Sequence, residues 1–207
     1  MAIRVLPMLG LAVFSTVGIG WRTWYQYRHF GNSGWRLFRS GRWPQHLRES
    51  GLLLLMVLLG VQAVGYALDA RWLAPLVLAQ PPTGGVMAVL GALLLFGGTV
   101  LMVRAQLDLG ASWRIGFDEG SRPGLVTRGI YRFSRNPIYM ALFTVLAGFL
   151  VLVPTWISLG LFVGSIATVH NQIREEERFL RRAYGAEFDA YMRRVGRFVP
   201  GLGTLDV

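Results

Sequence analysis

Four long apolar runs limit what this chain can fold into more than any other feature of the sequence. They cover residues 5–20, 51–68, 85–103 and 138–169. An α-helix crosses a bilayer core of about 30 Å with roughly 20 apolar residues, so these runs are candidate membrane spans. With 53% hydrophobic residues and a mean hydropathy of +0.44, the chain is too apolar for an ordinary soluble domain. The sequence therefore predicts an all-α, polytopic integral membrane protein.

The arginines between the apolar runs predict how the chain is threaded through the membrane. Six arginines lie in residues 21–50, six in 104–137 and seven in the tail from residue 170, whereas 69–83 holds only Arg71. Because cytoplasmic loops carry the excess of arginine, the three arginine-rich segments are predicted to be cytoplasmic. The N-terminus, residues 69–83 and Pro154 are then outside. The net charge of +10 is attributed to this anchoring, and no nucleic acid is expected as a partner.

The last apolar run decides the number of spans. Pro154 interrupts residues 138–169, and the tail returns to the cytoplasm only if this run forms two helices. Each arm then has about 15 residues, which is short for a span, so one long kinked helix is the alternative. We favour the hairpin, which gives about five transmembrane helices and a cytoplasmic C-terminal amphipathic helix. The predicted location is the bacterial inner (plasma) membrane, with the active site facing the cytoplasm.

The first apolar run raises the question of a signal peptide. Residues 1–20 have one early arginine and a short apolar core, but no clean small-x-small cleavage site precedes Trp21. Cleavage would also leave the arginine-rich residues 21–50 outside the membrane. We therefore expect this run to remain as the first span.

Few groups in the sequence suit metal or thiol chemistry. The chain has no cysteine, and His29, His46 and His170 lack the spacing of metal ligands. We predict no metal site. Any chemistry is expected in the loop that begins at Arg104 and in the tail.

The tail has the pattern of one amphipathic helix. At 100° per residue, its large apolar residues fall within a stripe of about 80°. The stripe residues are Ile173, Leu180, Tyr184, Phe188, Tyr191 and Val195. Glu177 lies inside the stripe, Glu176 lies at its edge and Glu175 points the opposite way. A carboxylate on such a face needs a cation or hydrogen-bond donors, unless the glutamates only pair with surface arginines such as Arg178.

A proline-marked turn separates the arginine-rich loop from the last apolar run, in the stretch RGIYRFSRNPIYMALF of residues 128–143. Pro137 has no amide hydrogen and disfavours helix at Asn136, so a helix is predicted to begin just after the turn. Amides in the first turn of a helix attract anions, including carboxylates. Arg135 either adds positive charge there or anchors the loop at the membrane interface.

Two blocks of the sequence resemble the isoprenylcysteine carboxyl methyltransferase and phospholipid methyltransferase superfamily. The first is LVTRGIYRFSRNPIY at 125–139, and the second is EERFLRRAYGAEFDAYMRRVGRFVP at 176–200. The matching residues are Leu125, Val126, Thr127, Gly129, Tyr131, Arg135, Pro137, Tyr139, Glu176, Glu177, Leu180, Gly185, Tyr191, Arg197 and Pro200. Enzymes of this superfamily are integral-membrane proteins that use S-adenosylmethionine. The resemblance covers about residues 107–200, so we divide the chain into N-terminal transmembrane helices with a cytoplasmic loop (1–103) and a methyltransferase-like catalytic half (104–207).

The resemblance implies a pocket for S-adenosylmethionine between the two blocks. The implied cofactor-binding residues are Gly124, Leu125, Val126, Gly129, Tyr131, Asn136, Pro137, Tyr139 and Glu176. Catalytic roles are implied for Glu176, Glu177 and Arg135. Counting back from Gly185 favours Glu176 as the acting carboxylate, whereas helical geometry favours Glu177, and the choice stays open.

Two positions depart from the superfamily pattern. Asn136 replaces a histidine, and asparagine does not titrate near neutral pH, so proton abstraction by this side chain is excluded while cofactor binding is not. Gln172 stands where prenylcysteine-specific members have an arginine that helps to hold the substrate. A prenylcysteine carboxylate is therefore disfavoured as the methyl acceptor.

The function predicted from the sequence is methyl transfer to a lipophilic or amphiphilic acceptor at the membrane. A phospholipid amine, a lipid carboxylate and a small thiol remain open as acceptors, and membrane lipids are the expected partners. The alternatives are an NADPH-dependent membrane reductase of the sterol-reductase type and a non-catalytic scaffold with a decayed cofactor pocket. The oligomeric state is not predicted.

Overall fold

The computed structural model describes residues 2–39, 43–116 and 124–199, and the regular elements in these ranges are helical. Seven α-helices, one π-helix (η1) and three short 3₁₀ helices (η2 to η4) occur there. In chain order they are α1 (Ala2–Val13), η1 (Phe14–Trp21), α2 (Arg22–Phe30), α3 (Trp43–Ala67), η2 (Arg71–Leu76), α4 (Gly85–Leu109), η3 (Gly110–Ser112), η4 (Gly129–Arg132), α5 (Pro137–Leu152), α6 (Trp156–Tyr184) and α7 (Ala186–Arg194).

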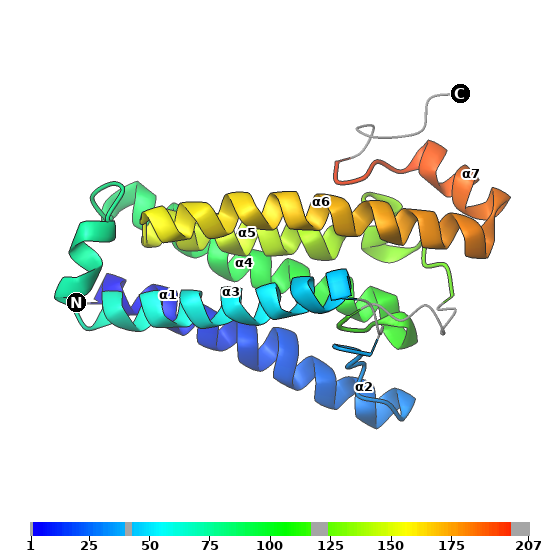
Figure 1. Cartoon of the computed structure of the whole chain (residues 1–207), viewed down its shortest axis with the longest axis horizontal. Helices are drawn as coiled ribbons and strands as arrows, with labels where there is room; N and C mark the ends of the chain where they lie inside the picture. The colour runs from blue at the N-terminus through cyan, green and yellow to red at the C-terminus, as the bar shows by residue number, and fades with distance from the viewer. Residues whose placement is uncertain (1, 40–42, 117–123, 200–207) are drawn as a thin grey trace.

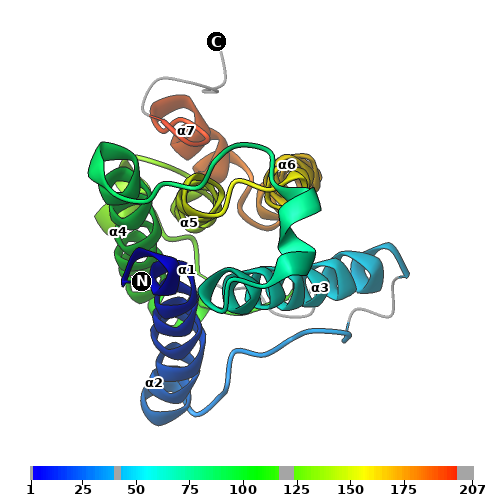
Figure 2. The ribbon, with the colours of Figure 1, turned by 90° about the vertical axis from the view of Figure 1, so that its left-hand side faces the viewer.

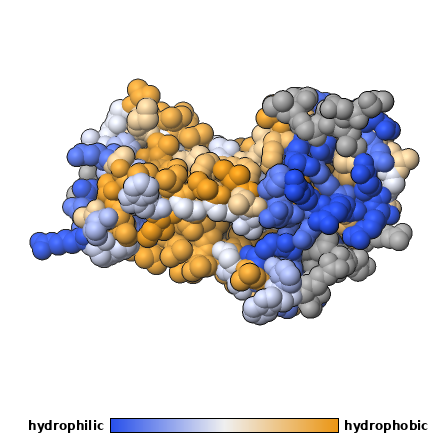
Figure 3. All heavy atoms as spheres, turned by 45° about the horizontal axis from the view of Figure 1, so that its top comes forward, coloured by the Kyte–Doolittle hydropathy of each residue, from blue (hydrophilic) through white to orange (hydrophobic). Residues whose placement is uncertain are grey.

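The long helices run side by side in alternating directions (Figures 1 and 2). One end of the molecule holds the start of α1, the η2 segment and the junction of α5 and α6 (Figure 1). The opposite end holds α2, the start of α3, the end of α4 and α7. We call this second end the polar end, because hydrophilic surface gathers there while apolar surface covers the middle of the helices (Figure 3).

Three helical stretches within the described ranges are long and apolar enough to cross a membrane. They are Ile3–Phe30, Trp43–Ala67 and Gly85–Ser112, and Pro137–Leu152 is a shorter apolar helix. At 1.5 Å per residue, the 16 residues of α5 reach only about 24 Å, less than the bilayer core of about 30 Å. The chain is thus an integral membrane protein, and the count of five spans stays a prediction.

The last apolar run forms two separate helices. α5 ends at Leu152 and α6 begins at Trp156, and the two pack as an antiparallel pair (Figure 1). Thr155 caps α6 by accepting a hydrogen bond from the Ser158 amide at 3.0 Å. The Thr155 hydroxyl also donates to Gln62 of α3 at 2.5 Å, so the turn at Pro154 is tied to a second helix. These local bonds favour the hairpin over one long kinked helix.

α4 and α5 approach each other closely because glycines face the partner helix. A Cβ placed on Gly98 would lie 2.9 Å from the backbone nitrogen of Val145, and one on Gly148 would lie 2.7 Å from the carbonyl of Gly91. Neither distance allows a larger residue without a shift of the backbone. Membrane helices commonly use small residues in this way. α4 also runs continuously across the division that the sequence placed between residues 103 and 104.

The helix that begins with α1 continues through η1 into α2, beyond the apolar run, and the buried Arg22 side chain anchors this continuation. Residues 21–30 were expected to begin a loop, but α2 is helical to Phe30. The Arg22 side chain is fully buried, and it donates to the carbonyls of Gln106 at 3.2 Å and Gly110 at 2.9 Å. These carbonyls lie at the C-terminal end of α4, where a cation is favourable. Arg22 therefore fixes α2 against the end of α4.

The prediction of one continuous helix in the tail is wrong. Gly185 has a φ of +51°, and it ends α6 and starts α7. Glycine adopts this backbone conformation readily, so the helix breaks here. The apolar residues on the two sides of the break still meet in one cluster. The cluster consists of Leu125, Leu180, Tyr184, Phe188, Tyr191, Met192 and Val195.

The arginine distribution leads to a test of membrane topology. A reporter fused after Val207 is expected to be cytoplasmic, and a reporter inserted near Pro81 is expected to be outside. Green fluorescent protein and alkaline phosphatase at each position would report the two compartments. Exchanged locations would overturn the five-span threading and place the polar end on the other side of the membrane.

Candidate active site

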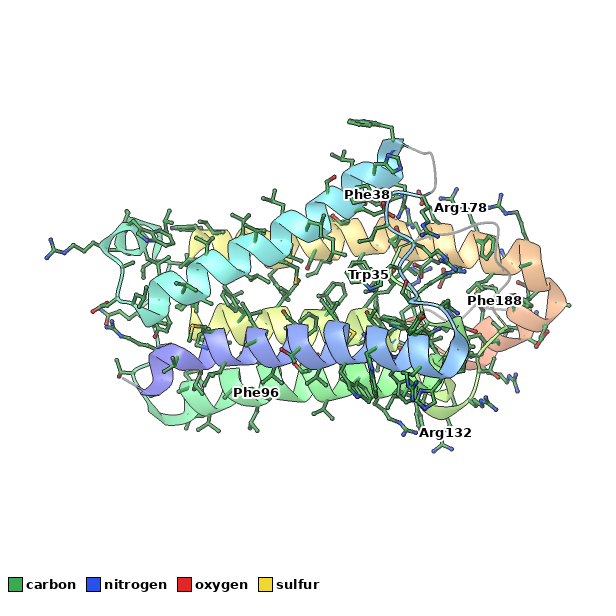
Figure 4. The ribbon with its side chains drawn as sticks, turned by 90° about the horizontal axis from the view of Figure 1, so that it is seen from below. Trp35, Phe38, Phe96, Arg132, Arg178 and Phe188 are labelled. Carbon is green, nitrogen blue, oxygen red and sulfur yellow. The ribbon has the colours of Figure 1, made fainter. Side chains whose placement is uncertain are left out.

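A cavity of about 420 Å³ opens at the polar end and continues between the helices. Pockets for small ligands commonly have volumes of 300–1,000 Å³. Its walls come from η1, α3, α4, α5, α6 and α7, and from the segments that precede α3 and α5. Figure 4 shows Trp35 and Phe188, two of the lining residues, at this end of the molecule, together with the outward-pointing Arg132 and Arg178.

Glu176 bridges the two helices of the hairpin at the cavity. Its Oε1 atom accepts a hydrogen bond from the Tyr139 hydroxyl at 2.7 Å and another from the Gln172 amide at 3.1 Å. Burial raises the pKa of the Glu176 carboxyl above its ordinary value, while these hydrogen bonds and the charge of Arg114 act in the opposite direction. Glu176 thus presents a half-buried carboxylate to the cavity, held by two hydrogen bonds.

Glu177 lies beside Glu176 on the cavity wall, but it is held by two arginines. Arg135 donates to Glu177 at 2.9 Å, and Arg197 donates to it at 2.6 Å. The Arg135 side chain is only 4% exposed, so its charge is buried with that of Glu177. The hydrogen bond from Arg197 to Glu177 also raises the pKa of that guanidinium. Glu175 points elsewhere and pairs with Arg48 of α3 at 2.7 Å.

Arg135 joins the loop before α5 to the tail. Its Nη1 atom donates to the carbonyls of Met192 at 3.1 Å and Val195 at 2.6 Å. Its backbone amide donates to the Gly196 carbonyl at 3.0 Å. The side chain is therefore buried in a structural junction and does not anchor the loop at the membrane interface.

The turn at Asn136 and Pro137 forms as predicted, with Pro137 as the first residue of α5. The Asn136 amide nitrogen donates to the Arg197 carbonyl at 3.1 Å, and its backbone nitrogen donates to the Ser134 hydroxyl at 3.2 Å. Asn136 is 9% exposed and lines the cavity. The turn thus places the N-terminus of α5 next to the tail, within reach of Glu176 through Tyr139.

The segment before this turn supplies apolar and aromatic surface. Gly124, Leu125, Val126 and Tyr131 line the cavity. The backbone carbonyl of Tyr131 accepts a hydrogen bond from the Tyr191 hydroxyl at 2.6 Å, and burial raises the pKa of the Tyr131 phenol well above its ordinary value. The segment is therefore packed against α7 and holds its shape at the cavity edge.

Two of the residues predicted to bind the cofactor lie behind the cavity wall. Pro137 and Gly129 are not among the residues that line it. Gly129 has a φ of +62°, and a side chain there would overlap the Asp108 carboxylate. Asp108 in turn accepts a hydrogen bond from the Ile130 amide at 2.8 Å and pairs with Arg104 at 3.1 Å. Gly129 therefore shapes the turn that carries Tyr131.

The sequence did not reveal two parts of the site. Asp108 was missed, although its spacing of four residues from Arg104 is typical of an ion pair on one helix face. A short parallel pairing was also missed: the Arg36 amide donates to the Ile115 carbonyl at 2.8 Å, and the Ile115 amide donates to the Gly34 carbonyl at 2.9 Å. This pairing brings Trp35 to the cavity, and no sequence pattern relates segments so far apart.

The family comparison agrees with the motifs in the sequence. Residues 86–187 match the family model of the phospholipid methyltransferases. The family name implies methyl transfer to a lipid. The matched range contains nearly all of α4, the hairpin and both glutamates, and it excludes α1, η1, α2, α3 and η2. No curated protein matches the chain.

Proposed function

We propose that this protein transfers a methyl group from S-adenosylmethionine to a lipophilic or amphiphilic acceptor at the membrane. The observation that carries the proposal is the half-buried Glu176 carboxylate, which lines a cavity that has both polar and apolar residues in its walls. The match of residues 86–187 to the phospholipid methyltransferase family model supports the class of reaction. We further propose that the polar end faces the cytoplasm, where the polar cofactor enters.

The residues around the cavity fit the chemical groups of S-adenosylmethionine. The Glu176 carboxylate suits the ammonium group of the methionine half. Helix amides in a first turn lack partners within the helix, so the start of α5 at Asn136 suits the carboxylate of the same half. Leu125, Val126 and Tyr131 offer apolar and aromatic surface to the adenosine. Both charged groups of the methionine half are thereby matched.

Methyl transfer asks little of the protein beyond holding two groups in line. When bound, S-adenosylmethionine supplies an electrophilic methyl group on a sulfonium centre. An acceptor that is a free amine, a thiolate or another anion attacks it directly, and rate enhancement comes chiefly from positioning. This agrees with Asn136, whose amide cannot take up a proton near neutral pH.

Arg135 and Glu177 have a different role from Glu176. Their charges offset each other, and Arg135 also binds two carbonyls of the tail. We assign both to positioning: they hold the tail against the loop before α5 and so keep the two walls of the cavity together. Glu176 is the carboxylate that we assign to the cofactor.

Binding measurements on the purified full chain in detergent test this proposal. S-adenosylmethionine is expected to bind and NADPH is not. Binding of NADPH alone would favour the reductase reading, and binding of neither would favour a scaffold. Mass spectrometry of host lipids and small thiols with methyl-labelled cofactor, with and without the protein, would then identify the acceptor.

Replacing Asn136 by histidine tests whether this position only binds. The Asn136→His variant is expected to keep cofactor affinity within about tenfold, on the order of 1.4 kcal/mol, because an imidazole N–H can still donate to the Arg197 carbonyl. Isothermal calorimetry gives the affinity, and a pH–rate profile gives the titration. A large gain in activity with a new pKa near 6.5 would indicate a lost base and a decayed pocket.

A further inference from the structure

The deep part of the cavity is built by helices outside the matched family region. Phe14, Gly18 and Ile19 of η1 and Leu52 and Met56 of α3 line it, together with Met102 of α4. We call this set the apolar arm. Residues 86–187 supply only Met102 of these six residues. The first part of the chain therefore determines the shape of the arm.

One buried polar side chain of the cavity wall is hydrogen-bonded to the apolar arm. Gln106 lines the cavity and is 5% exposed. Its Nε2 atom donates to the Gly18 carbonyl at 2.9 Å. A carbonyl only accepts, so this bond fixes which way the amide points. The other amide atom, Oε1, is buried and has no hydrogen-bond partner within the described part of the chain.

The π-helix explains why Gln106 is oriented in this way. Residues Phe14–Trp21 form i to i+5 hydrogen bonds, which widen the helix and turn carbonyls such as that of Gly18 out of their α-helical positions. The Gly18 carbonyl takes the donor of Gln106, and the acceptor of Gln106 is left over. A buried acceptor without a partner is costly, so a ligand that donates to it gains affinity.

We infer that the apolar arm holds the hydrocarbon chain of the methyl acceptor, and that Gln106 accepts a hydrogen bond from an N–H or O–H group next to that chain. This inference rests on the proposed function. We assign the arm to the acceptor and not to the cofactor, because six apolar residues line the arm and the cofactor is polar at both ends. Leu53, which follows Leu52 and also lines the cavity, is 46% exposed, so the cavity reaches a surface of α3 from which a lipid can enter.

Gly18 offers a way to fill the arm without disturbing the fold. A Cβ on Gly18 would meet Phe14 at 3.8 Å and Met102 at 3.9 Å, which are ordinary contacts. In the Gly18→Leu variant the rest of the side chain would occupy the arm. Gly97→Leu is the matched control, because Gly97 lies on the exposed face of α4 with nothing within 4 Å of an added Cβ.

The test uses a long-chain primary alkylamine that carries a photoreactive diazirine in its chain, with the full-length protein in lipid nanodiscs. Irradiation is expected to label Met56 and Met102, as read by mass spectrometry. Gly18→Leu should lower this labelling by at least about tenfold and Gly97→Leu should not, while labelling of the lipid-facing Leu93 stays constant in both. Labelling confined to lipid-facing residues, or equal in both variants, would overturn the inference.

A second variant isolates the hydrogen bond. Gln106→Met keeps the length of the side chain and removes the acceptor. It should reduce labelling by the amine probe about tenfold. Labelling by a probe of equal length that ends in a methyl group should not change. Equal losses with both probes would mean that Gln106 only supports the helices, and would remove it from the inference.

Cofactor binding is measured in parallel, so that the two proposals can fail separately. If the parent protein does not bind S-adenosylmethionine, the proposed function fails whatever the labelling shows. If it binds the cofactor and the arm is not labelled, the inference about the arm fails and the proposed function stands.

Discussion

Replacing Glu176 by glutamine is expected to weaken S-adenosylmethionine binding by at least about thirtyfold. Removing one partner of a buried charge pair costs roughly 2–5 kcal/mol, and Gln keeps the shape and the acceptor for the Tyr139 hydroxyl. The loss would therefore report the missing charge and not a disturbed fold. Isothermal calorimetry on protein in detergent measures it, with thermal unfolding as the check on folding.

Glu175→Gln is the control for this variant, because it is the same substitution one residue away. Glu175 pairs with Arg48 and its side chain is 35% exposed, so the expected cost is below about 1 kcal/mol. Cofactor affinity should not change. If Glu176→Gln and Glu175→Gln both bind like the parent, the assignment of Glu176 to the cofactor fails.

The same carboxylate predicts how binding depends on pH. Burial raises the pKa of Glu176, so in the free protein this group takes up its proton at a pH above its ordinary value of 4.5. A cationic ammonium binds the charged form, so affinity should fall as the pH is lowered through that raised pKa. Glu176→Gln should lose this dependence. A parent whose affinity is flat above pH 4.5 would argue against contact between Glu176 and the ammonium.

Replacing Glu177 by glutamine is expected to destabilise the docking of the tail by roughly 3–5 kcal/mol. The change leaves Arg135 buried without its compensating charge, and breaking a buried pair by removing one partner has costs of this size. Arg197 loses the same partner. Limited proteolysis should cut the chain near Gly185 faster than in the parent, and the melting temperature should fall.

An exposed pair in the same tail provides the comparison for Glu177. Asp189→Asn removes the partner of Arg181, whose side chain is 52% exposed, and should cost less than about 1 kcal/mol. Cleavage of the two variants at the same rate would mean that the Glu177 cluster does not hold the tail. Cofactor affinity is expected to fall in Glu177→Gln as well, but together with stability and not on its own.

The sequence predicted the helical architecture because that depends on local patterns. The length of an apolar run, Pro154 and Pro137 each influence the residues beside them, and the start of α5 after Asn136 followed from such a signal. The pairing of the two motif blocks around one cavity was implied by the family resemblance and not by local patterns. The roles of the two glutamates followed from neither.

Helical geometry predicted that Glu177 lies deeper than Glu176 because it treated the residues on both sides of Gly185 as one continuous helix. The break at Gly185 means that this stripe averaged the faces of α6 and α7. The actual difference is in partners: Glu177 meets Arg135 from the loop before α5 and Arg197 from the tail after α7. Such long-range pairing depends on how the chain folds back and has no sequence period.

The π-helix gives the first membrane helix a place that can absorb a change of one residue in length. Each residue turns an α-helix by about 100°, and a π-helix absorbs extra residues without advancing the turn in the same way. Arg22 fixes the far side of η1 against α4. Deleting one residue from Phe14–Trp21 would therefore let this stretch return to an α-helix and keep the face that α1 presents to its neighbours. Chains of this fold that differ by one residue in this stretch would keep the packing of α1 and α2 and change only the wall that Phe14, Gly18 and Ile19 give to the cavity.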